Sequence, residues 1–167
     1  AGVSVAGDGT RCVHGGHPAV GVGEPLHPGP VLSSTFRLGD DDGGDFYGRA
    51  GNPTWRALES AIGELDGGGC VLFASGMAAV SAVLELVGGK PVVVPQDGYY
   101  LARTLARERG PVREVPTTGP WPADGAALVL LETPSNPGLD VTDLAAAAAE
   151  AHAAGALLAV DNTTATP

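Results

Sequence analysis

Residues able to do acid–base or binding chemistry follow two apolar runs in the last third of the chain. Glu132 and Asn136 follow the first run, and Asp161 and Thr163 follow the second. An alanine-dense helical stretch, opened by residues 142–143, separates the two runs. This order predicts a parallel βαβ unit, with both polar groups at the carboxyl ends of neighbouring strands, where open α/β sheets bind ligands. The positions of these polar residues alone fit ordinary strand-to-loop connections as well as they fit a ligand-binding site.

A second candidate site has the composition of a phosphate-binding turn. Ser75, Gly76 and Met77 follow a short apolar run and precede a helix of small residues. In a strand–turn–helix unit, the free amides of the turn and the helix dipole attract an anion. Alone the pattern is weak, because many strand–helix turns contain Ser-Gly.

Tyr47 and Arg49 form a third candidate pair. They stand two positions apart on a segment that we expect to be extended, so both side chains can point the same way. A guanidinium and a phenol hydroxyl together suit a phosphate group. A surface arginine beside a packed tyrosine is the ordinary alternative.

The composition sets limits on function. The chain has 167 residues, 44% of them hydrophobic, and a net charge of -10, which is globular but disfavours nucleic acid or anionic membrane as a partner. Cys12 and Cys70 lie far apart, which favours a reducing cytoplasm over a disulfide framework. No apolar run approaches the ~18 residues of a membrane span. His14 and His17 have no third ligand nearby, so no metal site is expected.

The pattern of apolar residues and turn residues predicts an α/β fold. Residues 1–45, rich in glycine, proline and aspartate, are expected to form an arm or a long loop. A helix is expected from the Asn-Pro-Thr turn at 52–54 to the glycines at 67–69. The remaining predicted helices cover 78–86, 101–109 and the alanine-dense stretch, and the predicted strands cover 71–74, 92–94, 111–116, 128–131 and 157–160.

Several short sequence motifs together resemble those of one enzyme family. They are FYGRAGNPT at 46–54, FASGMAA at 73–79, ETPSNP at 132–137 and VDNTTATP at 160–167. Their wording and order resemble the cystathionine γ-synthase and γ-lyase family, the pyridoxal-phosphate (PLP) enzymes of cysteine and methionine metabolism. The resemblance runs from Thr10 to Pro167 but spans less than half of a complete family member.

This resemblance implies the large domain of a fold-type I PLP enzyme, with the cofactor's phosphate on the turn at 75–77. It also implies that Tyr99, the one residue assigned a catalytic role, stacks on the ring, and that Asn136 contacts the ring hydroxyl. The resemblance further implies that Asp161 pairs with the pyridine nitrogen and that Thr163 belongs to the same cofactor site. Tyr47 and Arg49 are implied to reach the phosphate in an adjacent subunit, which requires a homodimer or homotetramer.

The sequence departs from the family pattern in two places. The family continues its tyrosine with Gly-Gly-Thr or Gly-Cys-Thr, whereas Tyr100, Leu101 and Ala102 follow here, and Tyr100 is an alternative stacking ring. Thr164 replaces the usual phenylalanine. The single lysine, Lys90, precedes a predicted strand and so lies at the wrong end for a Schiff base, whereas the family's lysine comes after the VDNT phrase.

We therefore expect an N-terminal portion of an enzyme that does not catalyse alone. Residues 1–45 would be the arm and residues 46–167 part of the PLP-binding large domain, with the lysine and a small C-terminal domain elsewhere. The implied activity is a carbon–sulfur lyase acting on a sulfur-containing amino acid, with room for a domain of a larger biosynthetic protein. The alternatives are a γ-replacement synthase or sulfhydrylase, and a non-catalytic protein that keeps the fold.

Overall fold

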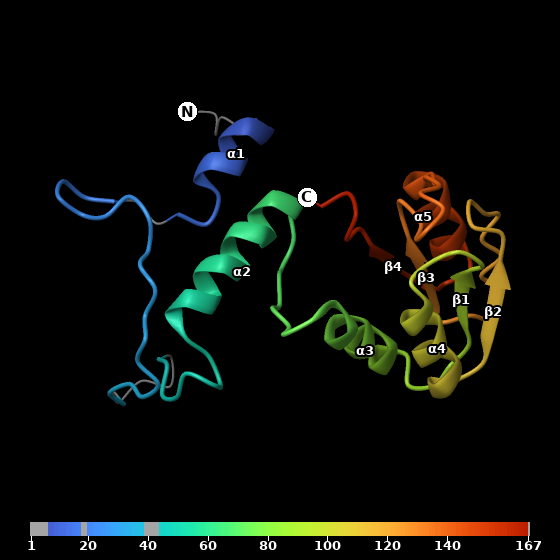
Figure 1. Cartoon of the computed structure of the whole chain (residues 1–167), viewed down its shortest axis with the longest axis horizontal. Helices are drawn as coiled ribbons and strands as arrows, with labels where there is room; N and C mark the ends of the chain where they lie inside the picture. Colours follow the sequence, from blue (N-terminus) through green and yellow to red (C-terminus); the bar gives the residue numbers. More distant parts are fainter. Residues whose placement is uncertain (1–6, 18–19, 39–43, 167) are drawn as a thin grey trace. The chain divides into compact units, whose positions relative to one another are not determined.

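The computed structural model describes residues 7–17, 20–38 and 44–166 (Figure 1). The chain divides into two compact units, the first ending at Leu72 and the second running from Phe73 to Thr166. The predicted boundary between arm and large domain, at residues 45 and 46, falls inside the first unit and remains a prediction. The two units are described separately below.

The second unit contains a four-stranded sheet in which every neighbouring pair is parallel. Its strands are β1 (Val92–Pro95), β2 (Val112–Val115), β3 (Leu128–Glu132) and β4 (Leu157–Asp161), in the spatial order β2-β1-β3-β4. The central strands β1 and β3 are buried along their whole length, as expected for parallel strands covered on both faces. This arrangement confirms the predicted parallel α/β class and four of the five predicted strands.

Three helices complete the unit. They are α3 (Gly76–Leu86), α4 (Tyr100–Arg109) and α5 (Leu144–Ala153). The side chains of Ser75 and Asp143 cap the first and the last of these helices by accepting backbone N–H groups of the first turn. These helices agree with the predicted ones to within one or two residues.

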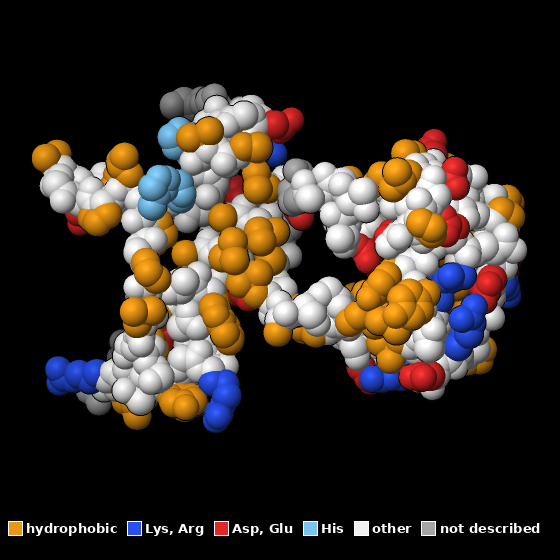
Figure 2. Space-filling model, in the orientation of Figure 1, with side chains coloured by type: hydrophobic (Ala, Val, Ile, Leu, Met, Phe, Trp, Pro, Cys, Tyr) orange, Lys and Arg blue, Asp and Glu red, His pale blue; other side chains and the backbone are white. Residues whose placement is uncertain are grey.

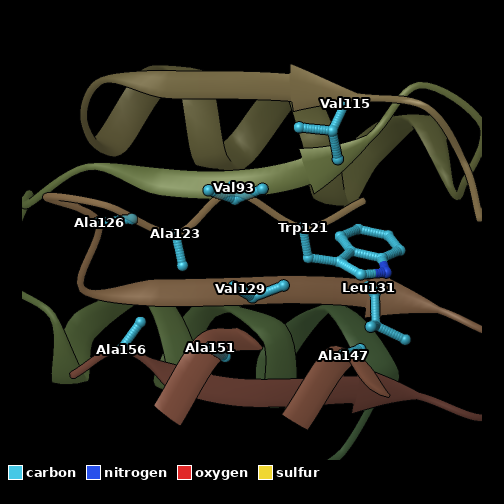
Figure 3. Packing of buried hydrophobic residues seen from close by; sticks show 10 residues of the cluster. All are labelled: Val93, Val115, Trp121, Ala123, Ala126, Val129, Leu131, Ala147, Ala151 and Ala156. Atoms are coloured by element: carbon cyan, nitrogen blue, oxygen red, sulfur yellow. The ribbon is translucent and has the colours of Figure 1, made fainter. Parts of the chain in front are cut away.

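Two apolar layers, one on each face of the sheet, hold the unit together. Because side chains alternate along a strand, Val93, Val129 and Leu131 face α5, while their neighbours in β1 and β3 face α3 and α4. In the first layer the ring of Trp121 packs near Val115 and Leu131 (Figure 3). The small alanines of α5 let that helix lie close to the sheet.

The first unit is built around α2 (Pro53–Asp66). Asn52 caps this helix by accepting the Trp55 N–H, and Gly67 ends it with a left-handed φ of 67°. This confirms the predicted helix and its glycine stop.

The predicted arm contains a helix that the sequence analysis did not predict, α1 (Asp8–His14). A helix of 7 residues is too short to be stable alone, so its stability must come from packing on α2. The Gly16 N–H donates to Glu64 Oε2 at 2.8 Å. An added Cβ at Gly16 would lie 2.4 Å from the Ala61 amide nitrogen, so only glycine permits this approach. Such a contact between distant residues leaves no local sequence signal.

The prediction of a strand at 71–74 is wrong. A strand requires a neighbour that pairs with its amides and carbonyls, and this segment joins none of the strands in the described residues. The Leu72 N–H donates instead to the Glu59 carboxylate at 3.0 Å. Val71 is 72% exposed, so the apolar character that suggested a buried strand does not reflect burial here.

Apolar side chains remain exposed on the first unit, as the space-filling view shows (Figure 2). Phe46, Trp55 and Leu58 are 46–58% exposed, and the one buried residue of α2 is Gly63. This unit therefore has little core of its own. Among the described residues, no helix is long and apolar enough to cross a membrane.

The first prediction concerns the sheet core. Leu128→Ala should lower the free energy of unfolding by about 2–5 kcal/mol, because Leu128 is 1% exposed and its truncation leaves a cavity between β3 and the α3 layer. Urea titration followed by circular dichroism measures the change. The control is Leu86→Ala, since Leu86 is 75% exposed and should change stability by less than about 0.5 kcal/mol. Equal effects of the two variants would contradict the assigned core.

Candidate cofactor site at the carboxyl edge of the sheet

A cavity of about 340 Å³ lies at the carboxyl edge of the sheet in the second unit. Four segments form it: the N-terminus of α3, the loop after β1, and the segments at the ends of β3 and β4. Its volume is in the range of small-molecule and cofactor sites. The lining residues are Ser75, Gly76, Met77, Val80, Tyr99, Glu132, Asn136, Asp161 and Thr163.

The N-terminus of α3 forms the anion-binding end of this cavity. Ser75 Oγ accepts the Ala78 N–H at 3.2 Å, which leaves the Ser75 hydroxyl hydrogen available to a ligand. The amides of Gly76 and Met77 have no partner within the helix, because the first turn lacks preceding carbonyls. An added Cβ at Gly76 would meet no atom within 4 Å, so open space lies in front of the helix end. This geometry suits a phosphate group.

Two carboxylates meet where β3 and β4 end. Glu132 and Asp161 are partners in the parallel register of these strands. Asp161 Oδ1 accepts the Thr163 N–H at 3.0 Å and the Thr163 hydroxyl at 2.5 Å, which fixes the carboxylate at the strand end. Within this structure, Thr163 therefore contacts Asp161 as well as lining the cavity. A fixed carboxylate in a half-buried position can hold a proton on a ring nitrogen.

Glu132 connects β3 to the loop after β1. Glu132 is only 6% exposed, and its Oε2 atom accepts the Tyr99 N–H at 2.5 Å. Burial raises the pKa of the Glu132 carboxyl, the Tyr99 hydrogen bond opposes this effect, and the charges of Asp161 and Asp97 add to the rise. Removal from water is the largest cause, so the fold disfavours the ionised form.

Tyr99 and Tyr100 occupy different positions. Tyr99 lines the cavity and precedes α4, whereas Tyr100 begins that helix, is 62% exposed and does not line the cavity. The two rings pack edge to face with centroids 5.4 Å apart. The geometry favours Tyr99 as the ring available to a flat ligand.

Asn136 lies on the loop after β3 and lines the cavity. The sequence analysis gave no role to two residues that hold this loop, Asp97 and Ser135. Asp97 Oδ2 accepts the Ser135 hydroxyl at 2.9 Å and the Gly138 N–H at 2.9 Å. The available signal was the position of Asp97 just past the end of an apolar strand, at the same edge of the sheet as Asn136.

Tyr47 and Arg49 lie in the first unit, so the structure does not relate them to this cavity. The extended segment predicted for them is correct at Tyr47, which pairs with Thr35 in an antiparallel bridge, but wrong at Arg49. The chain turns at 48–50, where the Ala50 N–H donates to the Tyr47 carbonyl at 2.9 Å. The turn nevertheless brings them together, with the Arg49 guanidinium 4.9 Å from the Tyr47 ring centroid. Close by, Arg56 forms a two-point ion pair with Asp45, and this hydrogen bonding lowers the pKa of the Asp45 carboxyl.

The fold and the cavity define a class of protein: a parallel α/β domain with a small-molecule site at its carboxyl edge. The lining of this site combines a helix end that suits a phosphate with an aromatic ring, a carboxylate and an amide. These donors fit PLP. In the described ranges, no group of three His, Cys, Asp or Glu side chains could hold a metal ion.

Residues 10–167 match the family described as Cys/Met metabolism PLP-dependent enzyme, and the chain belongs to that family. It is 50% identical over 179 residues to a Streptomyces coelicolor protein that carries the provisional name cystathionine γ-lyase. It is 34% identical over 183 residues to the cystathionine γ-synthase of Mycobacterium tuberculosis. These matches confirm the family resemblance and the expected cofactor, PLP.

Solved structures agree with the fold. A cystathionine γ-lyase structure from Micromonospora echinospora superposes with a TM-score of 0.81 at 35% identity, covering 95% of this chain and 45% of that one. A cystathionine γ-synthase from Xanthomonas oryzae gives 0.79 at 36% identity. The chain covers 46% of the Streptomyces protein, so it spans about half the length of the relatives that it matches.

The second prediction follows from the buried Glu132 carboxyl. Because its pKa is higher in the folded state than the ordinary 4.5, the folded state binds more protons than the unfolded state just above that pH. The Glu132 contribution therefore favours folding at low pH and is lost as pH rises through the folded-state pKa. Glu132→Gln should remove this loss, so the stability of the variant relative to wild type should increase from pH 4 to pH 7.

Urea unfolding at about pH 4, 5.5 and 7 tests this sign, because the change begins near the ordinary pKa and continues above it. The control is Glu108→Gln, which neutralises an exposed glutamate on α4. If both variants show the same pH dependence relative to wild type, burial of Glu132 does not oppose its ionisation.

Proposed function

We propose that this chain forms the phosphate- and ring-binding part of a PLP-dependent carbon–sulfur lyase that acts on a sulfur-containing amino acid. The observation that carries the proposal is that Ser75, Gly76, Met77, Tyr99, Asn136 and Asp161 line one and the same cavity. The residue sets that the sequence suggested separately, a helix-end anion site and two strand-end polar groups, meet there. The Streptomyces relative supports a cystathionine γ-lyase-like reaction.

Each residue has a distinct part in the proposed site. The Gly76 and Met77 amides, with the Ser75 hydroxyl, would hold the phosphate. Tyr99 would cover one face of the ring, and Asn136 would contact the ring hydroxyl. Asp161 would keep a proton on the pyridine nitrogen. When bound with that proton in place, PLP supplies an electron sink for the substrate's α-carbon.

The lysine that such enzymes require is a further part of the proposal. Lys90 precedes β1 and so lies toward the amino end of the sheet, away from the cavity. We therefore propose that a part of the enzyme outside these 167 residues supplies the lysine and the small domain. The experiments below use the complete protein that contains this chain. We also propose that the complete enzyme is located in the cytoplasm.

A γ-replacement synthase is the second candidate, and the similarity to cystathionine γ-synthases favours it. Both reactions need the same cofactor site, so the residues described above do not separate them. Incubating the complete enzyme with cystathionine, and separately with cysteine and an activated homoserine ester, distinguishes the two. Release of cysteine and a keto acid supports the lyase, while formation of cystathionine supports the synthase. Absence of PLP binding would support the non-catalytic alternative.

The third prediction concerns Asp161. Asp161→Asn should lower kcat by roughly 100-fold, corresponding to ~3 kcal/mol for the loss of a preorganised charge partner. Asparagine has nearly the same shape but leaves the pyridine nitrogen largely unprotonated. Keto-acid release is measured with PLP in excess, and absorbance reports the bound cofactor. The control is Asp124→Asn, an exposed carboxylate on the loop before β3. Near-normal turnover of Asp161→Asn would rule out its pairing with the ring nitrogen.

The fourth prediction concerns assembly. We propose that Tyr47 and Arg49 serve the site of a neighbouring subunit in a dimer or tetramer; the exposed apolar surface of the first unit supports a partner there. Arg49→Ala should weaken PLP retention, because its guanidinium would bind the phosphate.

Mixing subunits tests whether the site is shared. A hybrid dimer contains one Arg49→Ala subunit and one Asp161→Asn subunit. If Arg49 serves the partner's cofactor site, both substitutions affect the same cofactor site and the other site contains neither. In assays without added PLP, where Arg49→Ala should lose its cofactor and Asp161→Asn should turn over slowly, random pairing should restore activity to about a quarter of wild type. Two Asp161→Asn preparations purified with different tags provide the matched control. No recovery in verified hybrids would show that Arg49 and Asp161 act in the same subunit's site.

A further inference from the structure

One carboxylate, that of Asp97, ties the end of β1 to the loop that follows β3. Its Oδ2 atom accepts both the Ser135 hydroxyl and the Gly138 N–H, each at 2.9 Å. Ser135 is fully buried, and its Oγ also accepts the Asp140 N–H at 3.0 Å. A Cβ at Gly138 would lie 2.5 Å from Asp97 Oδ2, so this approach requires glycine.

These hydrogen bonds fix the loop on both sides of Asn136. Within the described part of the chain, no side-chain hydrogen bond holds Asn136 itself, and the residue is exposed. Its place beside the cavity therefore depends on the backbone of its loop. That backbone is anchored at Ser135 and Gly138, and Asp97 is the group that binds both.

A second carboxylate makes the reciprocal connection. Glu132, at the end of β3, accepts the N–H of Tyr99, which lies on the loop after β1. A carboxylate at the end of β1 (Asp97) therefore binds the loop after β3, and a carboxylate at the end of β3 (Glu132) binds the loop after β1. Asp97 is itself anchored toward β2, because its N–H donates to Thr117 Oγ1 at 3.2 Å. Tyr99 and Asn136, which both line the cavity, are held by this pair of connections.

We propose that Asp97 is a positioning residue that places Asn136 relative to Tyr99 across the cavity. The identity of the ligand between them rests on the proposed function. Hydrogen bonds to a carboxylate are roughly twice as strong as neutral ones. Without Asp97, the buried Ser135 hydroxyl loses its acceptor and the loop loses its link to β1.

The first experiment measures the loop and the cofactor separately in the complete protein. Asp97→Ala should speed amide hydrogen exchange of residues 135–140 in the apo form by roughly tenfold, because the loop opens locally. It should also raise the dissociation constant of PLP, measured by absorbance titration of apo protein, by roughly tenfold. Asp97→Asn, which keeps one acceptor oxygen, should have a smaller effect. Asp140→Asn is the matched control, because it neutralises an exposed carboxylate of the same loop.

A double-mutant cycle separates positioning from a general loss of stability. If Asp97 acts through Asn136, Asp97→Ala should change PLP affinity little when Asn136 is already alanine. The same fold-change in both backgrounds would overturn the proposal, as would exchange in Asp97→Ala equal to that in Asp140→Asn. If exchange rises but Asn136→Ala leaves PLP affinity unchanged, the positioning by Asp97 stands and the proposed contact of Asn136 with the cofactor fails.

Discussion

The parallel pairing of β1, β3 and β4 is the constraint on which the site depends. Parallel strands end at the same edge of a sheet, so residues that follow different strands become neighbours there. Burial of β1 and β3 on both faces fixes their register, because a slip of one residue would turn their apolar side chains from one helical layer to the other. Glu132 and Asp161 are neighbours for this reason, since they are the last residues of paired strands.

The same edge concentrates negative charge, and backbone N–H groups offset much of it. Asp97, Glu132 and Asp161 each accept at least one backbone N–H, from Gly138, Tyr99 and Thr163 respectively. These contacts give the carboxylates a structural role in addition to any chemistry. They hold the loops after the strands in place, and Glu132 and Asp161 also line the cavity. The positive end of α3 lies on another side of the same cavity, which suits a ligand with an anionic group and a ring that accepts a proton.

The two units differ in how their helices are stabilised. In the second unit, α3, α4 and α5 bury apolar side chains against the sheet. In the first unit, α1 buries no residue and α2 buries only Gly63, so capping by Asn52 and the contacts at Gly16 carry more of the local order. The Tyr47–Arg49 pair belongs to this unit, where a turn rather than an extended strand brings the two side chains together.

The sequence by itself determined the elements whose signals are local. Continuous aliphatic runs identified β1, β3 and β4. The Asn-Pro-Thr turn and the glycine stop identified α2, the small-residue and alanine-dense stretches identified α3 and α5, and the motifs around Ser75, Asn136 and Asp161 identified the family. Only the tertiary structure decided the rest, because it depends on partners distant in the chain. The run at 71–74 is apolar but pairs with no described strand, and α1 forms although its own sequence is too short to specify a helix. The contacts of Asp97 with Ser135 and Gly138 join residues about 40 positions apart, and no local pattern encodes a hydrogen bond across that separation.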